Sequence, residues 1–280
     1  MNRILELFTI STGREDVNWE KVADEQHCSY LNRKCVKSRK SNPDLSIGTC
    51  SVKHGAEGVK KLIICPHRFE EKGQIFMDCA HLLTLHEPGN ELHVVSQVHV
   101  PGGNVDYVLT SVKDDKVVDF VGIELQALDT TGTLWPHRQR FLRSAGLNVT
   151  DEIDSKKPYG MNWKMTAKTI LVQLHHKIGT FEKLGKHFVL VLQDELLEYM
   201  RREFDFGDIE EARLGNSMHF HAYSLRDVEE SFSLRLDSRQ STNAVGIAKC
   251  MGLFASPDVE LVEIIKSLQR KVSESTLLTI

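Results

Sequence analysis

Polar side chains, including Asp119, interrupt two apolar runs between residues 104 and 126, and three of them are of types that suit metal-dependent hydrolysis. Asp106 lies in the first run, and Glu124 and Gln126 lie in the second. Because strand side chains alternate between faces, Glu124 and Gln126 are expected on one face, with Leu125 on the other. Two carboxylates at one end of a sheet form an oxygen site suited to Mg²⁺, and a polar neighbour can orient an attacking water. The same residues also fit ordinary polar positions in a sheet.

The surrounding residues predict the strands that must bring these side chains together. Both runs are rich in Val, Ile and aromatic residues, and the polar residues 113–116 separate them, which predicts two strands joined by a tight turn. Residues 92–100 are expected to form a preceding strand, and the turn at 101–103 leads into the Asp106 strand. Three consecutive strands predict an antiparallel meander, in which Asp106 meets Glu124 if their strands are neighbours.

Four cysteines occur in a polar segment that has few large apolar residues: Cys28, Cys35, Cys50 and Cys65. Such a segment has too little apolar surface for a core of its own, and four thiolates on one metal ion would order it. Tetrahedral sulfur ligation is typical of zinc or iron. Disulfides and scattered buried cysteines are the alternatives, and no C-x2-C pair is present. Cys79 and Cys250 lie in apolar runs and are interpreted as small hydrophobic residues.

The spacing Asp…Glu-x-Gln resembles the PD-(D/E)xK nuclease core, with Gln126 at the position of the usual lysine. The stretches around Asp106 and Glu124, together with the four upstream cysteines, are similar to NotI-type restriction endonucleases. This resemblance implies that Asp106 and Glu124 hold Mg²⁺, that the carbonyl of Leu125 adds a ligand, and that the four cysteines bind iron. Gln126 can orient water, but it is uncharged and no practical base. Glu91 and Gln97 are both candidates for a further site residue.

The fold expected from this resemblance is a mixed α/β (α+β) restriction-endonuclease-like core with a sheet flanked by helices. A helix is expected through Trp19, and another over 74–86. Residues 135–155 are interpreted as loop. Periodic apolar residues predict a helix from Asn162, and the apolar run 187–193 predicts a buried strand, together a strand–helix–strand crossover.

Helices are predicted over 195–204, 242–253 and 258–273, and a strand over 219–225 that places His219 and His221 on one face. Surface or packing roles are favoured for these histidines over metal binding because no third ligand is evident. We predict an N-terminal helix and four-cysteine metal-binding segment over 1–73, and a nuclease core with C-terminal elaboration over 74–280.

Composition indicates a soluble globular protein. No stretch approaches the length of a membrane span, and the N-terminus lacks a signal-peptide pattern, so a cytoplasmic location without membrane association is expected. The net charge of −4 does not favour DNA binding. Positive charge is nevertheless concentrated locally, which is typical of solvated surface unless a site gives it a role. The clusters are Arg33, Lys34, Lys37, Arg39 and Lys40, then Lys60, Lys61 and Arg68, then Arg138, Arg140 and Arg143.

The leading hypothesis is a sequence-specific, Mg²⁺-dependent type II endonuclease acting on double-stranded DNA. The resemblance and the symmetry of palindromic sites imply a homodimer. One alternative is a non-enzymatic, metal-stabilised DNA-binding protein in which the acids are only polar strand residues. Another phosphoester hydrolase is less favoured, because the sequence contains no P-loop, Rossmann, zincin or nucleophile-elbow motif.

Overall fold

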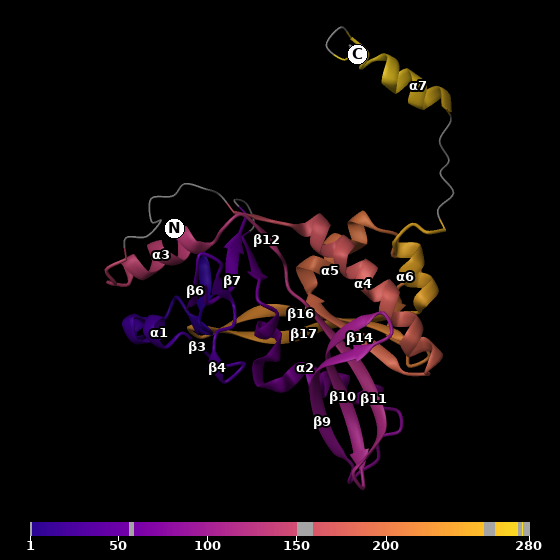
Figure 1. Cartoon of the computed structure of the whole chain (residues 1–280), viewed down its shortest axis with the longest axis horizontal. Coiled ribbons are helices and arrows are strands. Elements are labelled where there is room, and N and C mark those ends of the chain that lie inside the picture. The colour runs from indigo at the N-terminus through magenta and orange to yellow at the C-terminus, as the bar shows by residue number, and fades with distance from the viewer. Residues whose placement is uncertain (1, 56–58, 150–158, 255–260, 274–275, 277–280) are drawn as a thin grey trace.

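The protein is described from a computed structural model that covers residues 2–55, 59–149, 159–254, 261–273 and 276. Its centre is a seven-stranded sheet flanked by helices (Figure 1). Across this sheet the strands follow the order β15 (Glu210–Glu211), β17 (Ser231–Thr242), β16 (Met218–Val228), β14 (His187–Gln193), β11 (Lys116–Gln126), β10 (Gly103–Lys113) and β9 (Glu91–Val100). The predicted mixed fold with a large sheet and flanking helices is confirmed.

The sheet combines both strand directions. β9, β10 and β11 form the predicted antiparallel meander, whereas β14 runs parallel to β11 and to β16. The parallel connection from β11 to β14 includes α4 (Trp163–Lys183), so the predicted crossover is present. Asn162 is the N-cap residue of this helix, although its side chain makes no capping bond.

All residues of β14 are buried, because different elements cover the two faces of this strand. Phe188, Leu190 and Leu192 belong to the cluster that contains the apolar stripe of α4. Val189 and Val191 belong to a second cluster, which contains residues of η1 (Pro66–Gly73) and α2 (Gln74–Cys79). Since Ile123 and Leu125 of β11 also belong to this second cluster, Glu124 faces α4.

Gly122 explains how closely α4 approaches the sheet. A Cβ atom at this position would lie 2.5 Å from the Phe181 ring of α4 and 2.7 Å from the Phe188 ring of β14. A side chain there would therefore force the helix away from the strand. Glycine at position 122 therefore allows α4 to pack close to Glu124 on β11.

The chain contains further strands and helices outside this large sheet. A smaller sheet has the order β2 (Ile10–Ser11), β1 (Ile4–Leu7), β7 (Thr49–His54) and β8 (Lys60–Ile63). Two-stranded pairs are β3 (His27–Cys28) with β4 (Arg33–Lys34), β5 (Ser38–Arg39) with β6 (Asn42–Ser46), and β12 (Thr130–Thr131) with β13 (Gly160–Met161). The other helices are α1 (Trp19–Glu25), η2 (Ala80–Leu82), α3 (Trp135–Ser144), α5 (Asp194–Glu203), α6 (Ala244–Cys250) and α7 (Leu261–Gln269). Within the described ranges, no helix is long and apolar enough to span a membrane.

Two local predictions were wrong. Residues 135–144 form helix α3, because Trp135, Phe141 and Leu142 supply a buried face that the intervening basic residues obscured in the sequence. The helix expected over 74–86 is shorter, since α2 ends at Cys79 and continues only as the 3-10 turn η2. Residues 150–155 of the predicted loop and 258–260 of the predicted C-terminal helix lie outside the described residues.

Arg68 is buried, although it belongs to a predicted basic surface cluster. Its guanidinium donates to Glu6 of β1 at 2.9 Å, to Glu71 at 2.8 Å and to the Phe232 carbonyl of β17 at 3.0 Å. Three acceptors on separate segments offset the desolvation of this charge. Arg68 therefore links the small sheet to the large one.

Candidate active site

Asp106 and Glu124 lie opposite each other on adjacent strands. Tyr107 of β10 pairs with Ile123 of β11 in antiparallel register, which brings the preceding Asp106 opposite the following Glu124. The Oδ2 atom of Asp106 also accepts a 3.0 Å bond from the backbone N–H of Leu125. The two carboxylates therefore share one face of the sheet, as the sequence pattern required.

Glu124 is the buried member of this pair. Its Oε1 atom accepts a 2.8 Å bond from Nζ of Lys177 on α4, whereas its Oε2 atom is buried without a hydrogen-bond partner. Burial raises the pKa of Glu124, the bond from Lys177 opposes that rise, and the charge of Asp106 adds to it. An unpaired buried oxygen beside a second carboxylate is a suitable ligand for a divalent cation.

Gln126 lies two residues beyond Glu124 on the same face. Its Nε2 atom donates to the Ala127 carbonyl at 2.6 Å, which leaves the Oε1 atom to accept from other donors. Leu125 points its side chain into the apolar cluster on the other face. Its backbone lies beside Asp106, because its N–H group donates to the Oδ2 atom of that carboxylate.

The structure distinguishes the two candidates on β9. Gln97 lies beside Asp106, donating from Nε2 to Oδ1 at 3.3 Å. Glu91 pairs across from Val112, near the other end of β10, and its exposed side chain contacts His93. Glu91 is therefore remote from the candidate site, whereas Gln97 is part of it.

Lys177 is the site residue that sequence reasoning missed. It was recognised only as one of several basic residues on the predicted helix. A signal was available in the spacing, because Lys177 lies three residues after Leu174 and seven after Ile170. Helical periodicity therefore places it on the apolar stripe, where a lysine is unexpected. In the structure its side chain is 6% exposed and its partner Glu124 is 9% exposed, so the ion pair is buried.

The four predicted metal-binding cysteines line a common small cavity. Cys28 ends β3, Cys35 follows β4, Cys50 lies on β7 and Cys65 follows β8. The cavity has a volume of about 10 Å³, and His67 also lines it. A space of this size holds about one water-sized particle. Four thiols facing one such space are a chemically suitable donor set for zinc or iron.

Burial makes three of these four thiols weaker acids. Burial raises the pKa of Cys28, raises that of Cys50 well above its usual value, and raises that of Cys65 to about 11. The six cysteines of the chain are free. No group of three or more His, Cys, Asp or Glu side chains within the described ranges has metal-coordinating geometry. Coordination by the four cysteines therefore stays a prediction.

The same-face histidines of β16 are buried. His219 Nε2 lies 2.9 Å from the Asn216 carbonyl and 3.1 Å from His187 Nδ1, whereas His221 Nδ1 lies 3.7 Å from the Cys79 sulfur. Burial lowers the pKa of His219 to about 4 and that of His221 to about 3. Both rings are therefore neutral near pH 7, in agreement with the packing role favoured from the sequence.

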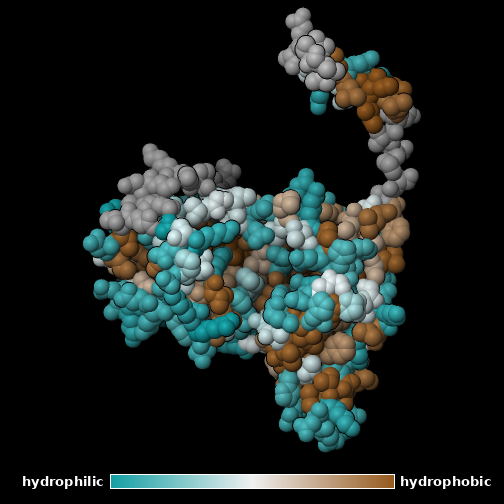
Figure 2. Space-filling view, viewed as in Figure 1, coloured by the Kyte–Doolittle hydropathy of each residue, from teal (hydrophilic) through white to brown (hydrophobic). Residues whose placement is uncertain are grey.

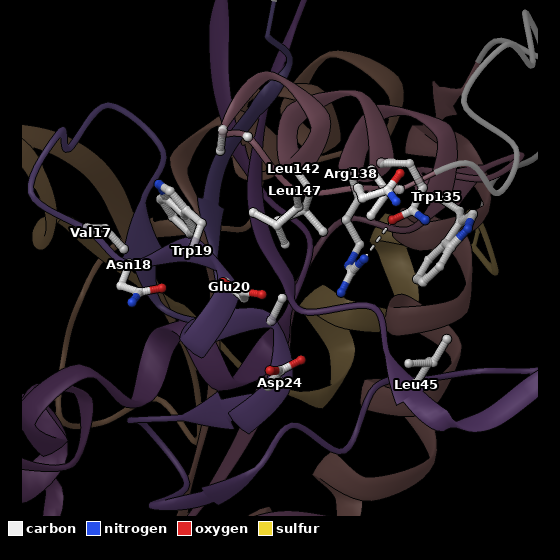
Figure 3. Close-up of a pocket in the computed structure, with 16 residues that line it drawn as sticks. Val17, Asn18, Trp19, Glu20, Asp24, Leu45, Trp135, Arg138, Leu142 and Leu147 are labelled. Atoms are coloured by element: carbon white, nitrogen blue, oxygen red, sulfur yellow. Dashed lines mark hydrogen bonds between the residues drawn. The ribbon is translucent and has the colours of Figure 1, made fainter.

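A separate cavity of about 710 Å³ lies between α1 and α3 (Figure 3). Its walls include Trp19, Trp135 and Arg138. Arg138 is buried and donates to Gln139 at 2.7 Å, the bond drawn in Figure 3, and to the Ile47 carbonyl at 3.1 Å. Arg138 is therefore a second member of the predicted basic clusters that does not face solvent. Neither Asp106 nor Glu124 lines this cavity.

Comparison with models of known protein families gives a match. The family model described as restriction endonuclease NotI matches residues 20–216. This range contains the four cysteines, both carboxylates, Gln126 and Lys177. A search of curated proteins found no match.

Proposed function

The chain belongs to the NotI restriction endonuclease family, and we propose that it cuts DNA by means of Mg²⁺ held between Asp106 and Glu124. Family membership establishes a sequence-specific type II endonuclease that acts on double-stranded DNA. The proposal adds a PD-(D/E)xK-type site. The observation that carries it is the unpartnered Oε2 of Glu124, which lies on the strand face that it shares with Asp106.

Each residue of this site has a separate role in binding the ion or orienting the attacking water. Asp106 and Glu124 would hold the ion, and the carbonyl of Leu125 would add an oxygen ligand. When bound, magnesium supplies positive charge to the phosphate and increases the acidity of a bound water. Gln126 accepts a hydrogen bond from the attacking water through Oε1 and orients it, because Nε2 is engaged by Ala127. Gln97 holds Asp106 from the neighbouring strand.

Incubation with a pool of random DNA duplexes tests this proposal. With Mg²⁺ we expect cleavage at one recurring sequence, and with Ca²⁺ in its place we expect binding to that sequence without cleavage. Sequencing of the product ends identifies the site and the cut position. Equal cleavage in excess EDTA would contradict metal dependence, and an intact pool would favour the non-enzymatic DNA-binding alternative.

A zinc or iron ion held by Cys28, Cys35, Cys50 and Cys65 is the second metal in this proposal. The support is the shared cavity together with the burial that raises the pKa of Cys28, Cys50 and Cys65, since a bound cation would favour ionisation of these thiols. The ion would order the polar segment between β3 and η1. The segment carries Lys and Arg residues, so its order would also determine where those charges meet DNA.

We further propose that the enzyme acts as a homodimer through β9. This strand is one of the two edges of the large sheet and exposes Leu92, Val94 and Val95. Figure 2 shows apolar surface on this projecting part of the sheet. An exposed apolar edge strand readily pairs with another chain, and a two-fold dimer would place two sites on the two strands of a palindrome.

Light scattering coupled to size-exclusion chromatography should therefore give twice the 31.8 kDa mass of one chain. Val94→Lys should shift the protein to the single-chain mass, because it places a charge on the apolar edge. A monomeric wild type would contradict the homodimer. A dimeric Val94→Lys variant would contradict the β9 interface alone.

A further inference from the structure

Lys177 occupies an unusual position for a lysine. Its ammonium group is buried on α4 and donates one of its three N–H bonds to Oε1 of Glu124 at 2.8 Å. In the part of the chain that the structure describes, no other Lys or Arg forms an ion pair with Asp106 or Glu124. Lys177 is therefore the local source of positive charge beside the two carboxylates.

The start of β10 holds α4 in this position. Gly102 and Gly103 have φ values of +101° and +134°, and a Cβ on Gly102 would lie 2.2 Å from the His176 carbonyl oxygen. Thr180 also donates to the Pro101 carbonyl at 3.0 Å. Because only glycine permits this approach, the turn before β10 and the helix carrying Lys177 are packed together at the site.

Stability and metal binding do not account for this lysine. A buried ion pair contributes little net stability compared with apolar residues of similar volume. A cation in contact with a ligand of Mg²⁺ also repels that ion. The attacked phosphate, in contrast, accumulates negative charge, and Gln126 has no charge to offset it.

We propose that Lys177 is a catalytic residue, supplying from α4 the positive charge at the scissile phosphate that Gln126 lacks. This inference rests on the proposed function of Asp106 and Glu124. In the reaction, the water oxygen bonds to phosphorus and the bond to the leaving sugar oxygen breaks. The water loses a proton to solvent, and the leaving oxygen gains one. Lys177 transfers no proton and acts through charge alone.

The test compares Lys177→Met, Lys177→Gln and Lys177→Arg with the wild type and with Lys168→Met. Lys168 is an exposed lysine nine residues earlier on α4, on the opposite side of the helix, and is the matched control. Three quantities are measured for each protein: the single-turnover cleavage rate in Mg²⁺, affinity for the same duplex in Ca²⁺, and affinity for Mn²⁺ alone by calorimetry. Thermal melting shows whether each variant is folded.

For the methionine and glutamine variants we expect cleavage to fall about 100- to 1,000-fold, the cost of removing one group that stabilises transition-state charge. Mn²⁺ affinity should be unchanged or tighter, because a repelling cation has been removed. DNA affinity in Ca²⁺ should stay within about threefold of the wild type, since other phosphate contacts remain. Lys177→Arg should retain more activity than either neutral variant, and Lys168→Met should match the wild type.

Cleavage by both neutral variants within tenfold of the wild-type rate would overturn the inference. Weaker Mn²⁺ binding by folded variants would also overturn it, because Lys177 would then position Glu124. If both neutral variants are unfolded, Lys177 is structural and the inference fails. If Asp106→Asn retains cleavage, the proposed function itself fails, so the two failures are distinguishable.

Discussion

Asp106→Asn and Glu124→Ala are expected to reduce cleavage of the recognised duplex at least about 1,000-fold, because each removes a ligand of the proposed ion. That loss corresponds to about 4 kcal/mol of transition-state stabilisation, within the range of metal-supplied charge stabilisation. Duplex binding in Ca²⁺ should survive, since most affinity comes from phosphate contacts elsewhere. The measurements are single-turnover cleavage and fluorescence anisotropy on the sequence recovered from the DNA pool.

Asp106→Asn tests the loss of a metal ligand with less effect on stability than Glu124→Ala. It removes a charge from a partly exposed side chain, and asparagine can still accept the bond from the Leu125 N–H group. Glu124→Ala instead leaves the buried Lys177 ammonium without its partner, which costs about 3 to 5 kcal/mol of stability. Its melting temperature must therefore be measured with its activity.

Glu91→Ala provides the matched control for both variants. Glu91 is an exposed acid near the opposite end of the same meander. It lies on β9, the proposed dimer strand, so its removal should leave cleavage unchanged in a variant that keeps the wild-type mass in light scattering. Cleavage by Asp106→Asn at one tenth of the wild-type rate or more would exclude Asp106 from the site. A large loss of cleavage in Glu91→Ala would show that activity depends on the acidic residues of the meander in general.

Cys50→Ser is expected to have the second-largest effect, the loss of one bound metal ion per chain and of several kcal/mol of stability. Cys50 is buried on β7, and its thiol faces the cavity shared with the other three cysteines. Structural zinc sites contribute about 10 to 16 kcal/mol of binding free energy at pH 7, and one missing ligand forfeits part of it. A loss of about 3 kcal/mol lowers Tm by roughly 6 to 12 °C in a chain of this size.

Elemental analysis of the purified protein provides the direct measurement and distinguishes zinc from iron. Cys250→Ser is the matched control, because Cys250 is also buried but lies on α6, outside the cysteine cavity. The control should keep its metal. Retention of one ion and of the wild-type melting temperature by Cys50→Ser would remove Cys50 from the proposed site.

Local sequence patterns determined the elements that carry the two carboxylates. The turn between the apolar runs and the two-residue period of strands placed Asp106 and Glu124 on one face, because hairpin register follows from local geometry. The unbroken apolar run of β14 and the periodic stripe of α4 likewise predicted their burial. The polar segment singled out the four cysteines, and the structure places them around one cavity, whereas metal binding there stays a prediction.

Only the tertiary structure decided which distant side chains meet these elements. Lys177 follows Glu124 by 53 residues, and its contact depends on how α4 packs through Gly102 and Gly122. Arg68 and Arg138 looked like surface charge, yet each is buried because carbonyl and side-chain acceptors from other segments surround it. Sequence periodicity specifies the face on which a residue lies. Packing between elements far apart in the chain decides what that face meets, and so the charge at the candidate site.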